Sequence, residues 1–394
     1  MMEQKLLDAI TALYDEMVDL RRHFHMYPEL SFKEVNTPKT IAAYHRDLGL
    51  EVREGVGTRG VVATLRGKYP GKTVAIRADF DALPITEEND VPYASTVDGV
   101  MHACGHDAHT AIALGMAKAF VSVKDDLHGN VVFIHQHAEE EDPGGAKAMI
   151  EDGALEGVDI IFATHMENYL PVHHVSHSPD YILAASDDFF ITIKGEGGHG
   201  AFPQDATDAV QIGAQLVANL HQLVSRKVDP LKSAVLTVGA FKAGEKANVI
   251  PGQATIEGTV RTFDDDVRAA LADWVKKVAE HTAAMYGAEV EVDYQFGYPA
   301  TKNDPDVNAL IVKAATALLP EGHVKAMAPN MGAEDFSYFT RQIPGAYFFT
   351  GSANEAKGFT YPYHHPKFDI DEQALLNGAK VMAKATLDYL TEAH

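Results

Sequence analysis

Residues 131–142 read Val131-Val132-Phe133-Ile134-His135-Gln136-His137-Ala138-Glu139-Glu140-Glu141-Asp142, an apolar run that leads straight into four consecutive acids. The short length of the run and its β-branched and aromatic residues are typical of a buried strand. Acids at the tip of a central strand of an open α/β sheet lie where such sheets bind ligands. A run of acids is otherwise a common solvated loop, so by itself the stretch predicts a strand and leaves the role of the acids open.

On both sides of this strand the chain alternates between strand and helix patterns. Further buried strands are predicted at 73–78, 158–164 and 346–350. Helices are predicted at 3–25, 37–48, 110–121, 145–150, 307–319 and 371–390. This alternation predicts an α/β sheet with helices on its faces.

Residues 186–296 follow a different order. The predicted elements are strand 188–194, helix 206–225, strands 234–241 and 254–262, helix 265–286 and strand 289–295. This β-α-β-β-α-β order is the split arrangement of a ferredoxin-like α+β sandwich. We therefore predict two domains, a discontinuous one made of 1–185 and 297–394 and an inserted one made of 186–296.

Composition excludes several classes of partner. The 394 residues carry a formal net charge of -23, which would repel nucleic acid and anionic membrane surfaces. No apolar run reaches the roughly eighteen residues of a membrane span, and the N-terminus has no signal-peptide pattern. The single cysteine rules out an intrachain disulfide and fits a reducing compartment, so we expect a cytoplasmic protein.

That cysteine lies in Met101-His102-Ala103-Cys104-Gly105-His106-Asp107-Ala108-His109. In an extended segment residues two apart project to one side, so Cys104 and His106 could hold the same metal, while Asp107 could cap the following helix. Thiolate and imidazole suit zinc and its neighbours. An isolated Cys-Gly-His is more often a buried cysteine beside surface histidines, so the motif alone decides little.

Two further histidines stand at informative places. His165 ends the apolar run 160–164, and His364 begins the pair His364-His365 just before the last predicted helix. A lone histidine at a strand end is commonly structural. Together with Cys104 and the acids after 131–135, however, these signals predict one metal cluster, in which two-metal hydrolysis would use one carboxylate as ligand and another as proton shuttle.

The chain resembles the hippurate hydrolase and auxin-conjugate hydrolase branch of the metallo-aminoacylase and carboxypeptidase family. The resemblance runs nearly end to end, through Arg22-His23-Phe24-His25-Met26-Tyr27-Pro28-Glu29-Leu30, Arg77-Ala78-Asp79-Phe80-Asp81-Ala82-Leu83-Pro84-Ile85 and His364-His365-Pro366-Lys367-Phe368. It implies a catalytic domain with a mixed sheet, of the metal-dependent aminopeptidase type, and an inserted lid and dimerisation domain. It also implies metal ligands at Cys104, His106, Glu140, His165 and His364, with Glu139 as the general base.

The sequence differs from the pattern of this family in two places. The branch reads Gln-Pro-Ala-Glu-Glu-Gly where this chain has Gln136-His137-Ala138-Glu139-Glu140-Glu141, so the register of base and ligand could slip by one. Asp79 replaces a histidine that ligates metal in the carboxypeptidase branch, and Asp81 is kept. We expect both aspartates to support the ligands from behind.

For the inserted domain the resemblance implies a role in substrate binding. His199, in the glycine-rich loop 195–200, would enter the active site of a second subunit and stabilise the oxyanion. Asn248 and Arg261 resemble positions that hold the substrate carboxylate or line the cleft. Gly332, in Met331-Gly332-Ala333-Glu334-Asp335-Phe336, would let the backbone approach substrate. The expected assembly is a homodimer or a dimer-based oligomer.

The expected function is hydrolysis of the amide bond of small N-acyl-L-amino acids by two divalent metal ions per subunit, which could be zinc, manganese, cobalt or nickel. A dipeptidase or carboxypeptidase and an N-acetyl-diaminopimelate deacetylase keep the same chemistry and remain open. A metal-dependent binding protein without catalysis is a more remote alternative, because the base Glu139 is present.

Overall fold

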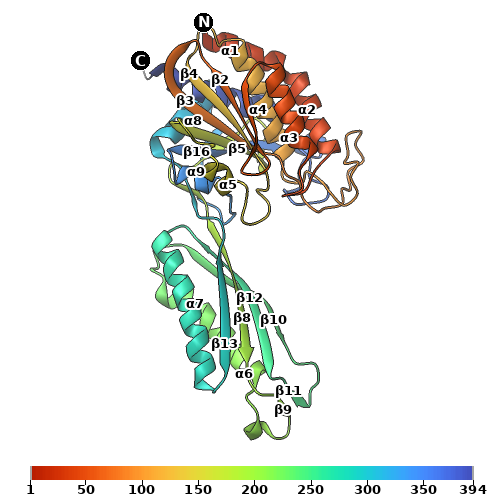
Figure 1. Ribbon diagram of the computed structural model, residues 1–394, viewed down its shortest axis with the longest axis vertical. Helices are drawn as coiled ribbons and strands as arrows, with labels where there is room; N and C mark the ends of the chain where they lie inside the picture. Colours follow the sequence, from red (N-terminus) through yellow and green to blue (C-terminus); the bar gives the residue numbers. More distant parts are fainter. Residues whose placement is uncertain (1, 393–394) are drawn as a thin grey trace. The chain divides into compact units, whose positions relative to one another are not determined.

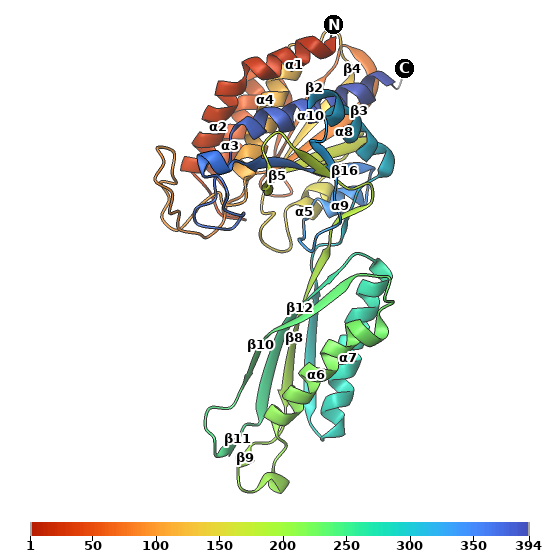
Figure 2. The same cartoon turned by 180° about the vertical axis from the view of Figure 1, so that it is seen from behind.

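The computed structural model describes residues 2–392, which form two compact units (Figures 1 and 2). The first unit comprises the residues up to Ile182, Thr301–Ala328 and the residues from Asp335 onward. The second comprises Leu183–Ala300 together with Pro329–Glu334. The short segment Pro329–Glu334 thus joins the second unit although it lies far along the chain.

The first unit is built on an eight-stranded mixed sheet. Its strands follow the order β1 (Glu51–Val56), β2 (Gly60–Arg66), β4 (His128–Gln136), β3 (Tyr69–Asp79), β5 (Ile160–Pro171), β16 (Gly345–Ala353), β6 (Val175–His177) and β15 (Val324–Ala326). The four central strands β4, β3, β5 and β16 run parallel, whereas β2 is antiparallel to β4 and β6 is antiparallel to β16. A small two-stranded sheet joins β7 (Tyr181–Leu183) and β14 (Thr301–Lys302).

Helices pack against this sheet. They are α1 (Met2–Ala12), α2 (Tyr14–Met26), α3 (Asn36–Asp47), α4 (His106–Val121), α5 (Ala146–Glu151), α8 (Pro305–Leu318), α9 (Ser337–Thr340) and α10 (Gln373–Glu392). The predicted α/β sheet with flanking helices is confirmed. The predicted single helix 3–25 is wrong, because the chain leaves helical geometry near Leu13, where neither glycine nor proline marks the break.

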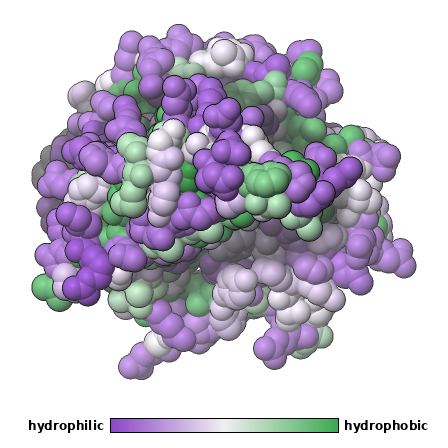
Figure 3. All heavy atoms as spheres, turned by 90° about the horizontal axis from the view of Figure 1, so that it is seen from below, coloured by the Kyte–Doolittle hydropathy of each residue, from purple (hydrophilic) through white to green (hydrophobic). Residues whose placement is uncertain are grey.

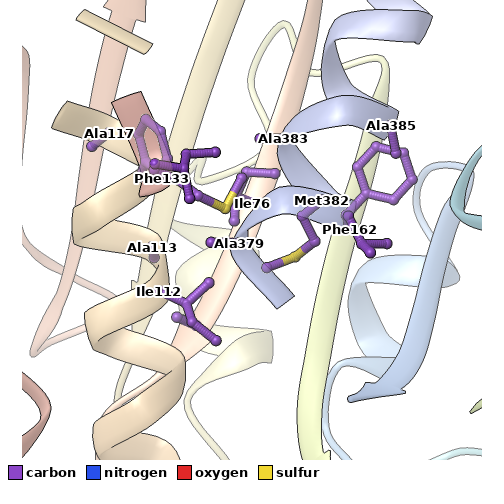
Figure 4. Packing of buried hydrophobic residues seen from close by; sticks show 14 of the residues in the cluster. Ile76, Ile112, Ala113, Ala117, Phe133, Phe162, Ala379, Met382, Ala383 and Ala385 are labelled. Carbon is purple, nitrogen blue, oxygen red and sulfur yellow. The ribbon is translucent and has the colours of Figure 1, made fainter. Parts of the chain in front are cut away.

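The core of the first unit lies between the central strands and the helices α4 and α10. Ile76, Phe133 and Phe162 project from β3, β4 and β5 toward small residues of the two helices, as Figure 4 shows. Alanines such as Ala113 and Ala379 let the helix backbones approach the sheet closely. Nearly every residue of α4 is buried, so the helix that carries His106 is held in a packed interior.

The second unit has its own core. Its antiparallel sheet has the order β10 (Ala234–Ala243), β12 (Gln253–Thr262), β8 (Ala185–Lys194) and β13 (Glu289–Phe296). Helices α6 (Ala209–Lys227) and α7 (Asp265–Met285) bury one face of it around Ile191, Leu220 and Leu271. The elements therefore occur in the β-α-β-β-α-β order expected from the sequence. A short ribbon of β9 (Gly198–His199) and β11 (Val249–Ile250) accompanies this sheet.

On the face seen in Figure 3 hydrophilic residues predominate, and hydrophobic ones lie scattered between them. None of the helices in the described part of the chain is both long enough and apolar enough to cross a membrane.

Truncating the core is expected to destabilise the first unit. Phe162 is fully buried, so Phe162→Ala should lower the free energy of unfolding by about 3–5 kcal/mol through lost burial and the cavity left behind. Denaturant unfolding measures the change. Val97→Ala, at a partly exposed position of the same unit, is the control and should cost less than about 1 kcal/mol. Equal losses in the two variants would contradict this account of the core.

Candidate metal centre

Four separate segments of the first unit bring the predicted metal ligands together. Cys104 and His106 lie at the start of α4, and Glu139 and Glu140 lie in the turn that follows β4. Because β3, β4 and β5 are parallel, the residues after β4 reach the same edge of the sheet as His165 of β5. The last member arrives from the irregular segment before α10.

Among the groups of potential ligand atoms that lie close together, two contain the five predicted ligands and overlap. In the first, Cys104 Sγ lies 3.3 Å from His165 Nε2, and His106 joins them. In the second, His364 Nε2 lies 3.2 Å from Glu140 Oε1, and Cys104 joins them. Within each group the ligand atoms lie within 4.8 Å of one another. Cys104 therefore belongs to both groups.

The donor set fits divalent transition metals. His106 Nε2 and Glu140 Oε1 are buried, and within residues 2–392 neither makes a hydrogen bond of good geometry, although His364 Nε2 lies 3.2 Å from Glu140 Oε1. A buried polar atom without a partner costs free energy, so such atoms call for an explanation. Thiolate, imidazole and carboxylate converging at these distances are the ligands that zinc and its neighbours bind. Nothing in the geometry conflicts with a metal there.

Asp81 orients two members of the cluster. Its carboxylate accepts hydrogen bonds from His106 Nδ1 at 3.1 Å, from the backbone N–H of Glu140 at 3.0 Å and from Ser31 Oγ at 2.7 Å. The bond at Nδ1 leaves Nε2 of His106 free to bind a metal. The sequence-based role of Asp81 as a supporting acid agrees with these contacts.

His109 and Asp79 fix His165 in a similar way. The backbone N–H of Met166 donates to His109 Nε2 at 3.0 Å, so the proton of the neutral ring lies on Nδ1 and is donated to Asp79 at 2.6 Å. The carbonyl of Met166 in turn accepts from His165 Nδ1 at 2.7 Å. The lone pair on His109 Nε2 is therefore occupied by the N–H of Met166. Asp79 also forms an ion pair with Arg77.

Electrostatics in the cluster favours a bound cation. Burial, with the nearby carboxylates of Glu140 and Glu139, raises the pKa of the Cys104 thiol well above its usual range. Burial opposes protonation of His106, but the carboxylates of Asp79 and Asp81 prevail and raise its pKa to about 10. Burial lowers the pKa of His165, which keeps that ring neutral and able to bind metal.

The expected capping role of Asp107 is wrong. Helix α4 begins at His106, with Gly105 at its N-cap in a left-handed conformation of φ +95°, so Asp107 lies inside the first turn. Its carboxylate accepts instead from the fully buried Arg21 at 2.8 Å and from His25 at 2.8 Å. Asp107 therefore ties α4 to α2.

The turn with the two glutamates is held by Glu34. Ala138 has a φ of +52°, which side chains other than glycine rarely adopt, and its N–H donates to Glu34 Oε1 at 3.0 Å. After this residue Glu139 is buried, Glu140 is partly buried and Glu141 is exposed. The burial pattern distinguishes the two inner acids from the outer one.

His199 and Asn248 lie together in the second unit. The ribbon of β9 and β11 places the backbone of Gly200 against Asn248, whose carbonyl accepts its N–H at 2.9 Å. His199 is exposed, and its Nδ1 accepts from the N–H of Ala201 at 3.1 Å. In the neutral ring the proton then lies on Nε2, which can donate to a ligand.

Arg261 and Gly332 also belong to the second unit but not to that ribbon. Arg261 lies near the opposite end of β12 from Gln253, where its guanidinium donates to Thr259 Oγ1 and to the carbonyl of Val260. At Gly332 a Cβ would lie 2.9 Å from Asn330 Oδ1, so a larger residue would displace the Asn330 side chain that accepts the Gly332 N–H. The roles of His199, Asn248, Arg261 and Gly332 in substrate binding and catalysis remain predictions.

Several residues that support the centre were not identified from the sequence. They are Glu34, Arg77, His109 and Asn168. His109 stands one helical turn after His106, which is a signal that could have been used. Glu34 and Asn168 meet the centre through contacts with residues far along the chain, which no spacing in the sequence reveals, and Arg77 meets it through Asp79, two residues away on β3.

Comparison with known proteins places the chain among relatives that match three quarters of its length or more. Residues 75–388 match the profile described as Peptidase family M20/M25/M40. An N-acyl-L-amino acid amidohydrolase of Geobacillus stearothermophilus is 44% identical over 299 residues, 76% of this chain and 80% of that protein. Thermostable carboxypeptidase 1 of Saccharolobus solfataricus is 41% identical over 379 residues, 95% of this chain and 96% of that protein.

A solved structure is similar over the same range. It is that of the YXEP protein of Bacillus subtilis, described as a dinuclear metal binding peptidase from the M20 family. The match covers 98% of this chain and 100% of that chain, with a TM-score of 0.84 and 35% sequence identity.

The buried Glu34 makes stability depend on pH. Burial raises the pKa of its carboxyl from 4.5 to about 7, so the folded chain binds this proton more tightly than the unfolded chain. The free energy of unfolding should therefore fall as pH rises from about 4.5 to about 7. Glu34→Gln cannot ionise and can still accept from Ala138. Relative to the native protein it should gain about 1–3 kcal/mol between pH 4.5 and pH 8.

Denaturant unfolding at the two pH values measures this gain. Glu141→Gln, at an exposed position in the same region, is the control, and its difference in stability from the native protein should be nearly the same at both pH values. A stability difference between Glu34→Gln and the native protein that is the same at both pH values would contradict the assignment.

Proposed function

The chain belongs to peptidase family M20/M25/M40, and we propose that it is a metal-dependent amidohydrolase of N-acyl-L-amino acids. The substrates would be of the hippurate or N-acetyl-amino-acid type, and the products a carboxylate and a free amino acid. The observation that carries the proposal is the convergence of one thiol, three imidazoles and one carboxylate, from Cys104, His106, Glu140, His165 and His364, on a single centre. The amidohydrolase of Geobacillus stearothermophilus, 44% identical, supports the substrate class.

Two divalent ions, zinc, manganese, cobalt or nickel, are the proposed cofactors. Cys104, His106 and His165 would hold one position, and Glu140 and His364 would complete the other, with Cys104 able to contribute to both. When bound, the ions supply a water of lowered pKa and a positive charge for the scissile carbonyl. The description of the YXEP protein as dinuclear supports the number two.

Glu139 is the proposed general base. Its Oε2 lies 4.0 Å from His106 Nε2, beside the ligand atoms, and its side chain is almost buried. From this place the carboxylate would take a proton from the attacking water and return it to the leaving amine. The exposed Glu141 is less suited to this role, because bulk water would surround its carboxylate.

The second unit would bind substrate and complete the site of a partner subunit. His199 Nε2, as a donor, would stabilise the oxyanion in a homodimer. Asn248, beside it, and Arg261 would hold the substrate carboxylate or line the cleft, and Gly332 would let the backbone approach substrate. The thiol ligand Cys104 fits the reducing cytoplasm, the compartment we propose.

A carboxypeptidase or dipeptidase is the second candidate, because a relative named thermostable carboxypeptidase 1 is 41% identical. The two activities share their chemistry and differ in the group on the acyl side of the amide. An N-acetyl-diaminopimelate deacetylase is a further variant of the same reaction. Hydrolysis of N-acetyl, N-benzoyl and dipeptide substrates by the purified protein would rank them.

Removing the base should abolish hydrolysis without removing the metals. Glu139→Ala should lower kcat at least about a hundredfold, because the proton transfer loses its acceptor. Glu141→Ala is the matched control. Glu141 lies two residues further along the same acidic run and is exposed, so this variant should keep most of the activity. Chelation should inactivate the native protein, and added metal should restore it. If Glu141→Ala were the inactive variant, the register of base and ligand would have to shift.

The proposed sharing of His199 can be tested by mixing inactive variants. His199→Ala and Glu139→Ala should each be inactive as pure proteins. Dimers that exchange subunits would contain one complete site, so an equimolar mixture should recover up to about a quarter of the native activity. A mixture that stays inactive although mass spectrometry detects mixed dimers would exclude a shared site.

A further inference from the structure

His364 is the least buried of the proposed metal ligands. Its side chain is 50% exposed, whereas Cys104, His106 and His165 are at most 8% exposed. It lies on an irregular segment and has a φ of +66°, a conformation that costs free energy for a residue with a side chain. Burial therefore does not hold this ligand, so its backbone must be held in another way.

One buried side chain binds both ends of the segment that carries His364. Asn168, three residues after His165, is 5% exposed. Its Nδ2 donates to the carbonyl of Tyr361 at 2.8 Å and to the carbonyl of Asp369 at 2.8 Å. Both partners can only accept, so this atom must be the amide nitrogen and both of its N–H groups are used.

The amide is itself fixed by the sheet. Its Oδ1 accepts from Ser352 Oγ at 2.5 Å, and Ser352 lies on β16, the strand paired with β5. Between the two bound carbonyls, the N–H of His364 donates to the carbonyl of Ala103 at 2.7 Å, next to Cys104. The segment is thus attached at both ends to the sheet and in the middle to the other ligands.

We propose that Asn168 is a positioning residue for metal binding, which holds the segment 361–369 so that His364 Nε2 faces Glu140. The inference rests on the proposed function, in which His364 is a ligand. Asn168 touches no ligand atom and acts through the backbone of that segment. Its loss should weaken the metal position that His364 completes and should leave the position of Cys104, His106 and His165 intact.

Asn168→Asp is the sharpest variant. It keeps the size of the side chain but replaces the donor by an oxygen that faces two carbonyl oxygens. Chelator competition should show one of the two metal equivalents bound about 10–100-fold more weakly, as in His364→Ala. Activity lost in Asn168→Asp should return when the metal concentration is raised, which a general folding defect would not allow.

Asn303→Asp is the matched control. Asn303 is also buried in the first unit, donates from Nδ2 to the carbonyls of Ser178 and Tyr347 at 2.8 Å, and accepts from the N–H of Tyr347. It lies on no segment that carries a proposed ligand, so Asn303→Asp should lose stability but keep both metal affinities. If Asn168→Asp does not fold, Asn168→Ser, which retains one donor, should show a smaller loss of affinity for the same equivalent.

The outcomes separate the two proposals. Native affinity for both equivalents in folded Asn168→Asp, or in Asn168→Ser, would overturn the positioning role while hydrolysis by the native protein stands. Equal metal loss in Asn303→Asp would also overturn it. Unchanged metal binding in His364→Ala would remove His364 from the ligand set and overturn the inference together with that part of the proposed function.

Discussion

Carboxylates and a thiol that are buried within a few ångströms of one another require positive charge, and the centre of the first unit is arranged around this constraint. Behind the centre the chain supplies the charge itself. Arg21 pairs with Asp107 and Asp369, and Arg77 pairs with Asp79 and Asp335. Each of these acids thereby has a fixed guanidinium group as an ion-pair partner.

At the metal centre itself, histidine side chains lie beside the carboxylate of Glu140. Glu140 Oε1 lies 3.9 Å from His106 Nε2 and 3.2 Å from His364 Nε2, and both histidines are themselves suited to bind metal. Burial and the carboxylates of Glu140 and Glu139 raise the pKa of the Cys104 thiol. A divalent cation would favour the thiolate and neutralise the glutamates together, so folding and metal binding are expected to support each other.

The directions of the ligand side chains are fixed by hydrogen bonds from groups that do not themselves point at the metal positions. Asp81 holds His106 and the backbone of Glu140, and His109 acts on His165 through the backbone N–H and carbonyl of Met166. Each uses a hydrogen bond to fix the direction of a ligand, which is why a centre assembled from four chain segments can have one geometry.

The sequence by itself determined the local structure and the chemistry of the ligands. Short apolar runs rich in β-branched and aromatic residues predicted the central strands, and alternating strand and helix patterns predicted the β-α-β-β-α-β order and most helices. Residue type and resemblance predicted the thiol, imidazole and carboxylate set at Cys104, His106, Glu140, His165 and His364. Only the tertiary structure decided which buried polar groups support that set. The contacts of Glu34 with Ala138, of Arg21 with Asp107 and of Asn168 with the 361–369 segment join residues far apart in sequence. No local pattern encodes such pairs, because they depend on how the strands and helices pack rather than on how each one forms.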